Sequence, residues 1–192
     1  MIHNLLKNKK IILASQSPRR KKIFDFLKIK YLQIPANIDE KTNYKSPRLI
    51  VKNNSKKKVK AISEGMDPEC IIIGADTIVY KDKKILEKPI DKFQAAEFLT
   101  NLSGDYHYVY TGLTINYQNK YITEYTKSKV EFYDLTASEI EEYINTKEPM
   151  DKAGAYGVQG LGSQFIKKIS GCYFNVMGFP VSLFYQVLKD ML

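Results

Sequence analysis

Residues 11–27 encode a strand, a tight polar turn and the start of a helix, and this unit constrains the fold more than any other stretch. Residues 11–13 form an apolar run typical of a buried strand. Ser17 suits the N-cap of the helix, and Pro18 suits its first turn, where the missing N–H costs nothing. Apolar residues beyond the turn recur on one predicted helical face: Ile23, Phe26 and Leu27. Main-chain N–H groups and the positive end of the helix dipole therefore meet at the turn, which suits an anion.

Arginine is concentrated at this turn. The chain has three arginines, Arg19, Arg20 and Arg48, whereas lysine is its usual cation. A guanidinium can hold two phosphate oxygens at fixed geometry, which an ammonium cannot do. The turn therefore predicts a polyphosphate site, and the alternative is a solvated, basic first turn of a helix.

The composition is that of a globular protein. The chain has 192 residues, of which 44% are hydrophobic, enough for one domain with a core or one domain split into two lobes. The net charge of +9 comes from lysines spread along the sequence, and the apparent lack of a clustered basic and aromatic face argues against nucleic-acid binding. No apolar run could cross a bilayer and no secretory signal is evident, so we expect a cytoplasmic protein without a membrane partner.

An acidic side chain follows the most apolar strand of the sequence. Residues 70–73 have the unbroken apolar character of a strand buried on both faces, and we expect Asp76 at its end. A buried carboxylate needs a cation, a proton or strong donors, and Gly74 and Ala75 leave room for another group to approach. Asp76 is therefore a candidate metal ligand or general base. The alternative is a carboxylate that caps a bulge or pairs with a lysine.

Three other segments carry side chains that could join this site. Glu40 lies in a polar loop, residues 37–41, and is a candidate metal or water ligand, the alternative being a solvated carboxylate. Lysines crowd a predicted helix at about residues 47–64, and one of them could reach a phosphate. Lys88 precedes Pro89, which fixes an extended backbone and suits a positioned cation, although a surface lysine is the alternative.

A glycine-rich segment lies near the C-terminus. Four glycines within residues 148–162 predict a tightly folded loop with positive φ angles or close ligand approach. The segment also concentrates side chains of mixed charge and polarity: Glu148, Asp151, Lys152 and Gln159. Gln159 is a candidate for reading a base edge, because a glutamine amide offers one donor group and one acceptor. A mobile surface loop is the alternative.

Five motifs, in this order and spacing, resemble the Maf family of nucleoside triphosphate pyrophosphatases. The resemblance runs from Ile11 to the C-terminal helix, and each motif is weak alone while the set is specific. The motifs are Ser15-Gln16-Ser17-Pro18-Arg19-Arg20, Gly74-Ala75-Asp76-Thr77, Glu87-Lys88-Pro89, Leu102-Ser103-Gly104, and the loop from Glu148-Pro149 to Gly160.

The resemblance implies a fold and a reaction. The fold is a mixed α/β structure, with an elongated sheet flanked by helices, two lobes and a central cleft, similar to inosine triphosphatases. Residues 1–192 would form a single Maf-like domain, and family members tend to be homodimers. The reaction is hydrolysis of a nucleoside triphosphate between the α and β phosphates, giving a monophosphate and pyrophosphate. A divalent cation, Mg²⁺ or Mn²⁺, would be the cofactor.

The resemblance also assigns residues. Asp76 matches the family's proton acceptor, Glu40 and Lys88 complete the catalytic cluster, and Glu40 and Asp76 are the implied metal ligands. The implied phosphate-binding residues are Ser15, Ser17, Arg19, Arg20 and Lys58.

Residues 151–160 look like the subgroup that acts on dTTP and UTP, and the matching specificity positions are Arg19, Thr77 and Gln159. One segment departs from the family pattern. The family shows Leu-Ala ahead of a Lys-Ala pattern in the helix before the central strand, whereas this chain reads Asn54-Ser55 followed by a run of lysines. The lysine that faces the site therefore stays open among Lys57, Lys58 and Lys60.

The sequence thus predicts a dTTP/UTP pyrophosphatase, which could also act on modified pyrimidine nucleotides. One alternative is a nucleotide-binding regulator of cell division, which needs the phosphate site but not the carboxylates. Another is a nucleic-acid-binding module, suggested by the positive charge and expected to show steeply salt-dependent affinity.

Overall fold

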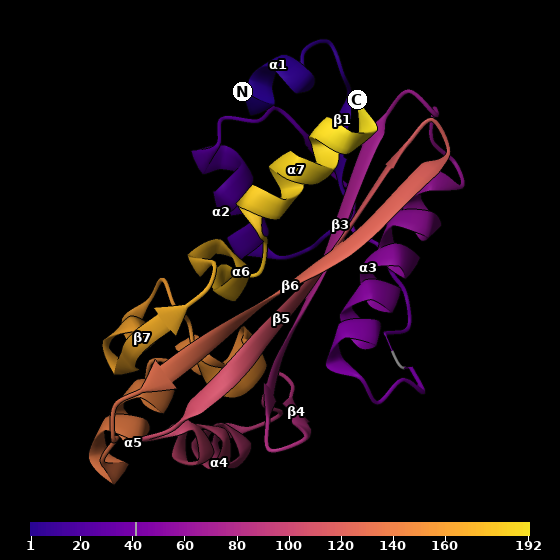
Figure 1. The fold of residues 1–192 in the computed structure, drawn as a ribbon. Coiled ribbons are helices and arrows are strands. Elements are labelled where there is room, and N and C mark those ends of the chain that lie inside the picture. The colour runs from indigo at the N-terminus through magenta and orange to yellow at the C-terminus, as the bar shows by residue number, and fades with distance from the viewer. Residues whose placement is uncertain (41) are drawn as a thin grey trace. The chain divides into compact units, whose positions relative to one another are not determined.

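The computed structural model describes residues 1–40 and 42–192, so Lys41, the last residue of the predicted polar loop, lies outside it. Helices and strands alternate through most of the chain (Figure 1). The elements are α1 (Ile2–Leu5), β1 (Ile11–Leu13), α2 (Pro18–Phe26), β2 (Leu32–Gln33), α3 (Pro47–Ser63), β3 (Ile71–Lys81), β4 (Lys84–Leu86), α4 (Lys92–Leu102), β5 (Tyr106–Tyr117), β6 (Lys120–Phe132), α5 (Ala137–Asn145), β7 (Ile166–Ser170), α6 (Tyr173–Met177) and α7 (Val181–Met191). Three 3₁₀ helices precede β7: Glu148–Asp151, Ala153–Ala155 and Leu161–Phe165.

The strands form one mixed sheet in the order β2-β1-β3-β5-β6-β7, with β4 paired to β3. β1 is parallel to both β2 and β3, whereas β4 and β7 are antiparallel to β3 and β6. Parallel neighbours in the N-terminal half and hairpins in the rest make this the mixed α/β sheet that the sequence predicted.

The chain divides into two compact units. Unit 1 comprises residues 1–76, 111–126 and 178–192, and unit 2 comprises residues 77–110 and 127–177. β3, β5 and β6 each contribute residues to both units. Two units agree with the two predicted lobes, and the cleft between lobes stays a prediction.

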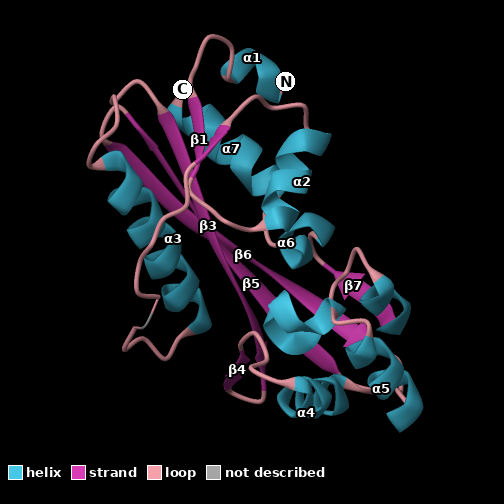
Figure 2. Cartoon of the chain, turned by 180° about the vertical axis from the view of Figure 1, so that it is seen from behind, coloured by secondary structure: helices cyan, strands magenta, loops and turns pink. Residues whose placement is uncertain are grey.

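Unit 1 has a layered core. Helix α3 lies on one face of its strands and α2 and α7 lie on the other (Figures 1 and 2). Phe24 of α2 packs edge-on against Phe179, which in turn packs against Phe184 of α7. On the α3 face, Val59 belongs to a buried cluster of small and branched side chains: Ile12, Ala14, Cys70 and Ile72.

Two glycines let α3 lie close to the sheet. A Cβ atom built on Gly74 would lie 2.6 Å from Cγ2 of Val59, and one built on Gly112 would lie 2.1 Å from the carbonyl oxygen of Val51. Neither contact is possible for a real side chain. Successive side chains of a strand alternate between faces, so Asp76, two residues after Gly74, points to the face that carries α3.

Unit 2 has its own core. Buried side chains of α4 and α5 pack with those of the unit 2 strands, including Leu99, Ile140, Val109 and Phe132. The first turn of α5 is fixed by a capping box between Thr136 and Glu139. None of the helices in the described part of the chain combines the length and the apolar character that a bilayer-spanning helix requires.

One detail of the predicted helix faces is wrong. Phe26 in α2 is 70% exposed, and the buried apolar residues of that helix are Ile23 and Phe24. The β2 strand spans Leu32–Gln33 alone, so the segment that leads to the predicted loop is mostly irregular. Apolar spacing located the α2 helix, but the rotation of the helix depends on which neighbours it meets.

Candidate active site

Asp76 is the centre of a buried polar cluster in unit 1. It lies in the middle of β3, not at the end of a strand as predicted, and its side chain is 7% exposed. Both carboxylate oxygens accept hydrogen bonds from α3. Lys58 Nζ lies 2.7 Å from Oδ1, and Asn54 Nδ2 lies 3.1 Å from Oδ2. The pairing with lysine that the sequence left open as a structural alternative is therefore present.

The structure also distinguishes the three lysines of α3. Lys58 Nζ lies between two carboxylates, 2.7 Å from Asp76 Oδ1 and 2.9 Å from Glu40 Oε1. Lys57 Nζ instead reaches the main-chain oxygen of Asp39 at 3.3 Å, and Lys60 is exposed. Lys58 is thus the lysine that faces the acidic residues.

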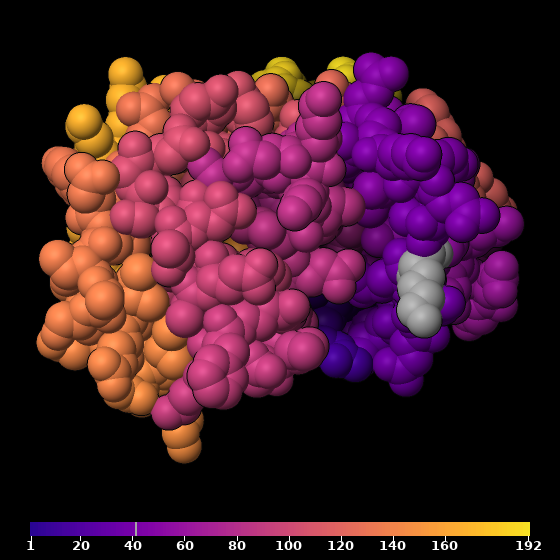
Figure 3. Space-filling model, turned by 90° about the horizontal axis from the view of Figure 1, so that it is seen from below, coloured from indigo at the N-terminus to yellow at the C-terminus, as the bar shows by residue number. Residues whose placement is uncertain are grey.

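The segment that carries Glu40 lies at the surface. The side chain of Glu40 is 55% exposed, compared with 10% for the side chain of Lys58. The purple segment that leads into α3 forms part of the molecular surface in Figure 3, and each of residues 31–40 is exposed or half-buried. Asp76 and Lys58 therefore belong to regular secondary structure, β3 and α3, whereas Glu40 belongs to an irregular segment that is open to solvent.

The cationic turn has the structure that the sequence predicted. Ser17 is the N-cap of α2 and Pro18 is its first residue. Ser15 Oγ accepts hydrogen bonds from the main-chain N–H of Ser17 at 3.2 Å and from Arg20 Nη1 at 3.0 Å. The start of α2 is thus held against the end of β1.

Arg20 has a structural task that the sequence did not reveal. It is buried, and its Nε donates a hydrogen bond of 2.8 Å to the carbonyl oxygen of Gly178, just before α7. Burial lowers the pKa of the guanidinium to about 10, although the carboxylate of Asp76 acts in the opposite direction. Arg20 therefore stays charged at neutral pH and contributes a fixed positive charge to unit 1. Arg19, its neighbour, is half-buried.

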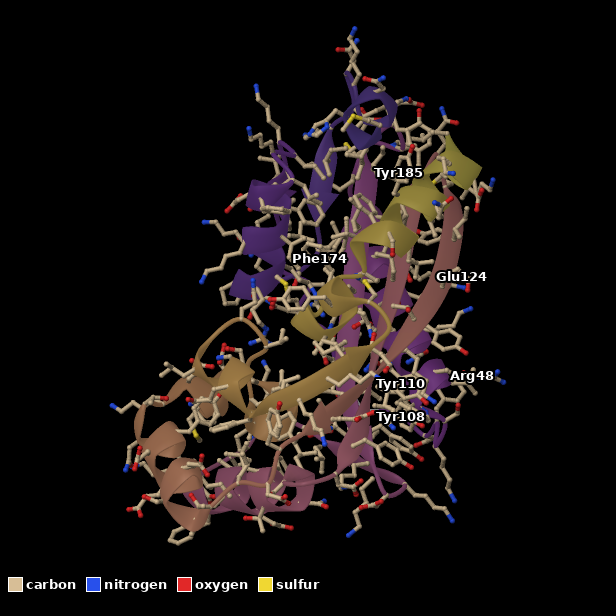
Figure 4. The ribbon with its side chains drawn as sticks, turned by 60° about the vertical axis from the view of Figure 1, so that its left-hand side comes forward. Arg48, Tyr108, Tyr110, Glu124, Phe174 and Tyr185 are labelled. Carbon is tan, nitrogen blue, oxygen red and sulfur yellow. The ribbon has the colours of Figure 1, made fainter. Side chains whose placement is uncertain are left out.

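Replacing Arg20 by lysine is expected to lower the free energy of unfolding by about 1–3 kcal/mol. A single ammonium cannot replace the two bonds that the guanidinium makes to Ser15 and to Gly178. Urea denaturation of Arg20→Lys and of Arg48→Lys, which changes an exposed arginine (Figure 4), would measure the difference. Equal stability of the two variants would show that the buried guanidinium holds nothing that a lysine cannot hold.

The remaining predicted site residues belong to unit 2. Thr77 follows Asp76 on β3 and is half-buried. Lys88 is exposed between β4 and α4, and Gln159 is exposed between two 3₁₀ helices. Their part in the site stays a prediction.

Glu148 organises the glycine-rich loop, a role that sequence reasoning missed. Its Oε1 accepts a hydrogen bond from Tyr143 Oη at 2.9 Å, and Oε2 accepts one from the N–H of Leu161 at 2.9 Å. A Cβ on Gly160 would lie 2.4 Å from both of these carboxylate oxygens. Residue 160 must therefore be glycine, because the carboxylate of Glu148 occupies the place where a side chain of that residue would begin.

His107 shows no sign of a catalytic role. Its Nε2 lies 2.8 Å from Tyr156 Oη, and burial lowers its pKa to about 3, so the ring is neutral. Within residues 1–40 and 42–192, no three histidine, cysteine or acidic side chains gather in a way that could hold a metal ion.

A clustered basic and aromatic face exists in unit 2, contrary to expectation. It consists of alternate residues of β5 and β6: Tyr106, Tyr108, Tyr110, Lys127 and Lys129. The ammonium groups already lie over the rings, with Lys127 Nζ 3.5 Å from the centroid of Tyr108. Glu131 on β6 pairs with Lys129 at 3.0 Å. Because its charges and ring faces are engaged within the unit, this face does little to favour the nucleic-acid alternative.

Comparison with known proteins identifies the family. A family model described as Maf-like protein matches residues 10–191. The chain belongs to the Maf family. This confirms the membership that the five motifs predicted.

Relatives of this Maf chain are similar over nearly their whole length. A protein of Thermosipho africanus named dTTP/UTP pyrophosphatase is 45% identical over 94% of this chain and 93% of its own length. One of Clostridium perfringens with the same name is 41% identical over 94% and 96%. The solved structure of the Staphylococcus aureus Ham1 protein covers 96% of this Maf chain and all of its own, with a TM-score of 0.55 and 14% identity. That likeness concerns the fold alone and agrees with the predicted inosine-triphosphatase-like class.

Proposed function

We propose that this Maf protein hydrolyses nucleoside triphosphates between the α and β phosphates, with dTTP and UTP, and modified pyrimidine nucleotides, as its substrates. The observation that carries the proposal is the sequence identity of 45% and 41% to two relatives named dTTP/UTP pyrophosphatase, each over 94% of this chain. The contacts within unit 1 support it, because the cationic turn and the carboxylates joined by Lys58 belong to the same compact unit.

The phosphate groups bind at the start of α2. The first N–H groups of the helix and the hydroxyl groups of Ser15 and Ser17 donate to phosphate oxygens. Arg19 binds phosphate directly, and Arg20 adds positive charge from a position fixed by its bonds to Ser15 and Gly178. Neutralising the triphosphate in this way is necessary before an oxygen nucleophile can approach phosphorus.

Asp76 accepts the proton of the attacking water. The water oxygen forms a bond to phosphorus as the bond to the bridging oxygen breaks, and pyrophosphate leaves with that oxygen. Lys58 and Lys88 stabilise the charge that develops on the phosphate oxygens, which is the largest contribution to catalysis in many enzymes. Thr77 and Gln159, with Arg19, select the base and sugar.

The acidic pair fits a divalent cation. Mg²⁺ commonly takes one or two protein carboxylates and completes its shell with water and substrate phosphates. Glu40 and Asp76 offer two carboxylates beside Lys58, whose ammonium contacts Oε1 of the first and Oδ1 of the second, so a cation would bind through their remaining lone pairs. Mg²⁺ or Mn²⁺ bound there would supply phosphate neutralisation and activation of water. We also propose a homodimer, from the family resemblance, and a cytoplasmic location, which is the expectation stated in the sequence analysis.

A panel of nucleoside triphosphates tests the function. We expect pyrophosphate and the monophosphate from dTTP and UTP, with kcat/KM at least about tenfold higher than for ATP and GTP, because unmatched base-edge hydrogen bonds cost about 1–3 kcal/mol. Each substrate is assayed with Mg²⁺ and with Mn²⁺ for pyrophosphate and for orthophosphate.

The products distinguish the alternatives. Orthophosphate in place of pyrophosphate would contradict cleavage between the α and β phosphates. Binding of dTTP without hydrolysis in the presence of either metal would favour the nucleotide-binding regulator, since that function needs the start of α2 but not the carboxylates.

A further inference from the structure

A buried amide lies against the carboxylate that we propose as the base. Counted as whole residues, Asn54 is 3% exposed and Asp76 is 5% exposed, and Asn54 Nδ2 donates a hydrogen bond of 3.1 Å to Asp76 Oδ2. Asn54 precedes Lys58 by four residues, so both project from one face of α3. The two donors therefore reach the two oxygens of one carboxylate.

The orientation of the Asn54 amide is defined. A carboxylate only accepts hydrogen bonds when ionised, so the NH₂ group of the amide must face Asp76. The other end of the amide, Oδ1, accepts a hydrogen bond of 3.3 Å from Asn53 Nδ2. Reversing the amide would place donor against donor at Asn53 and acceptor against acceptor at Asp76.

The contacts from Lys58 and Asn54 together fix the orientation of the Asp76 carboxylate, which a single contact would not do. The last torsion of an aspartate is broad, so a single bond from Lys58 to Oδ1 leaves the plane of the group free to turn. A second bond to Oδ2 fixes that plane. A carboxylate has about four lone-pair positions, so one on each oxygen is left for water or a cation.

We propose that Asn54, which this chain carries where the family pattern shows leucine, is a positioning residue for hydrolysis in this protein. It fixes the plane of the Asp76 carboxylate so that the remaining lone pairs face the attacking water. The inference rests on the proposed function for its kinetic consequence, but the geometry can be tested without turnover. Burying an amide is costly unless it is hydrogen-bonded, and the bond to Asp76 is what this amide gains at its position.

The test compares Asn54→Leu, which has nearly the same volume, with Ser55→Ala. Ser55 is also fully buried in α3, but its Oγ bonds to Thr114 and to the carbonyl oxygen of Lys52 rather than to Asp76. We expect kcat for dTTP to fall about 10- to 100-fold in Asn54→Leu with KM changed less than about threefold, since loss of such supporting contacts has effects of this size. Ser55→Ala should keep kcat close to the wild-type value, whatever its effect on thermal stability.

Crystal structures of the two variants supply a readout besides activity. The Asp76 carboxylate should be rotated or disordered in Asn54→Leu and unchanged in Ser55→Ala. Asn54→Ala, which cannot overpack, should behave like Asn54→Leu and serves if the latter does not fold. An unmoved carboxylate together with wild-type kcat in a folded Asn54 variant would overturn the inference. Absence of pyrophosphate release by the wild-type protein would instead overturn the proposed function, and the crystal structures would still decide whether Asn54 orients Asp76.

Discussion

Asp76→Asn is expected to slow pyrophosphate release from dTTP by about 10²- to 10⁴-fold. The substitution keeps the size of the side chain but removes the group that accepts the proton from water. It also removes one of the two carboxylates proposed to hold a divalent cation. Steady-state release of pyrophosphate, measured at saturating dTTP with Mg²⁺ and with Mn²⁺, gives the change in kcat.

The same variant should fold, with a moderate loss of stability. The carboxamide that Asp76→Asn introduces has one NH₂ group, which must face either the ammonium of Lys58 or the amide NH₂ of Asn54. A donor facing a donor in a buried site costs about 1–3 kcal/mol, so assays belong well below the unfolding temperature. Equilibrium binding of dTTP should persist, because the start of α2 is unchanged.

Glu124→Gln is the matched control for this experiment. It makes the same chemical change in unit 1, at a half-exposed carboxylate whose ammonium partner is Lys52, on the surface (Figure 4). Its activity should equal that of the wild type. A rate for Asp76→Asn equal to that of this control would exclude Asp76 as the base.

The sequence was most informative where local chemistry decides the structure. Ser17 and Pro18 define the start of α2 because an N-cap hydroxyl and a fixed φ angle suit the first turn. This helix boundary needs no knowledge of distant parts of the chain.

The composition of the site depends on packing between distant segments, which the sequence shows only in part. Gly74 indicated that something approaches β3, but not that the helix α3 would bring Lys58 and Asn54 to Asp76. Among so many lysines, the one that faces inward depends on the rotation of α3, and apolar residues are too sparse there to fix it. The sequence suggested only a phosphate-binding role for Arg20, because its burial and its bond to the main chain before α7 leave no local signal.

Lys58→Met should reduce both the free energy of unfolding and the rate of hydrolysis. In the double variant with Asp76→Asn, the loss of stability should be partly relieved while the loss of activity remains. Removing the ammonium leaves the buried carboxylate of Asp76 without its cation, and breaking a buried ion pair from one side costs about 3–5 kcal/mol. Activity should fall about 10²- to 10³-fold, because a charge that stabilises the transition state is lost. Lys57→Met, one residue earlier on the same helix, should change the free energy of unfolding by no more than about 0.5 kcal/mol.

Combining Lys58→Met with Asp76→Asn tests whether the stability loss comes from the unpaired charge. The carboxamide in the Asp76→Asn background carries no charge, so the loss of Lys58 should cost much less there than in the wild type. The double variant should then be more stable than the sum of the single losses predicts, by about 0.5–3 kcal/mol, while remaining inactive. Urea denaturation of the four proteins measures this coupling. Additive losses would mean that Lys58 stabilises unit 1 through its aliphatic chain rather than by neutralising Asp76, and the electrostatic account of the site would have to be abandoned.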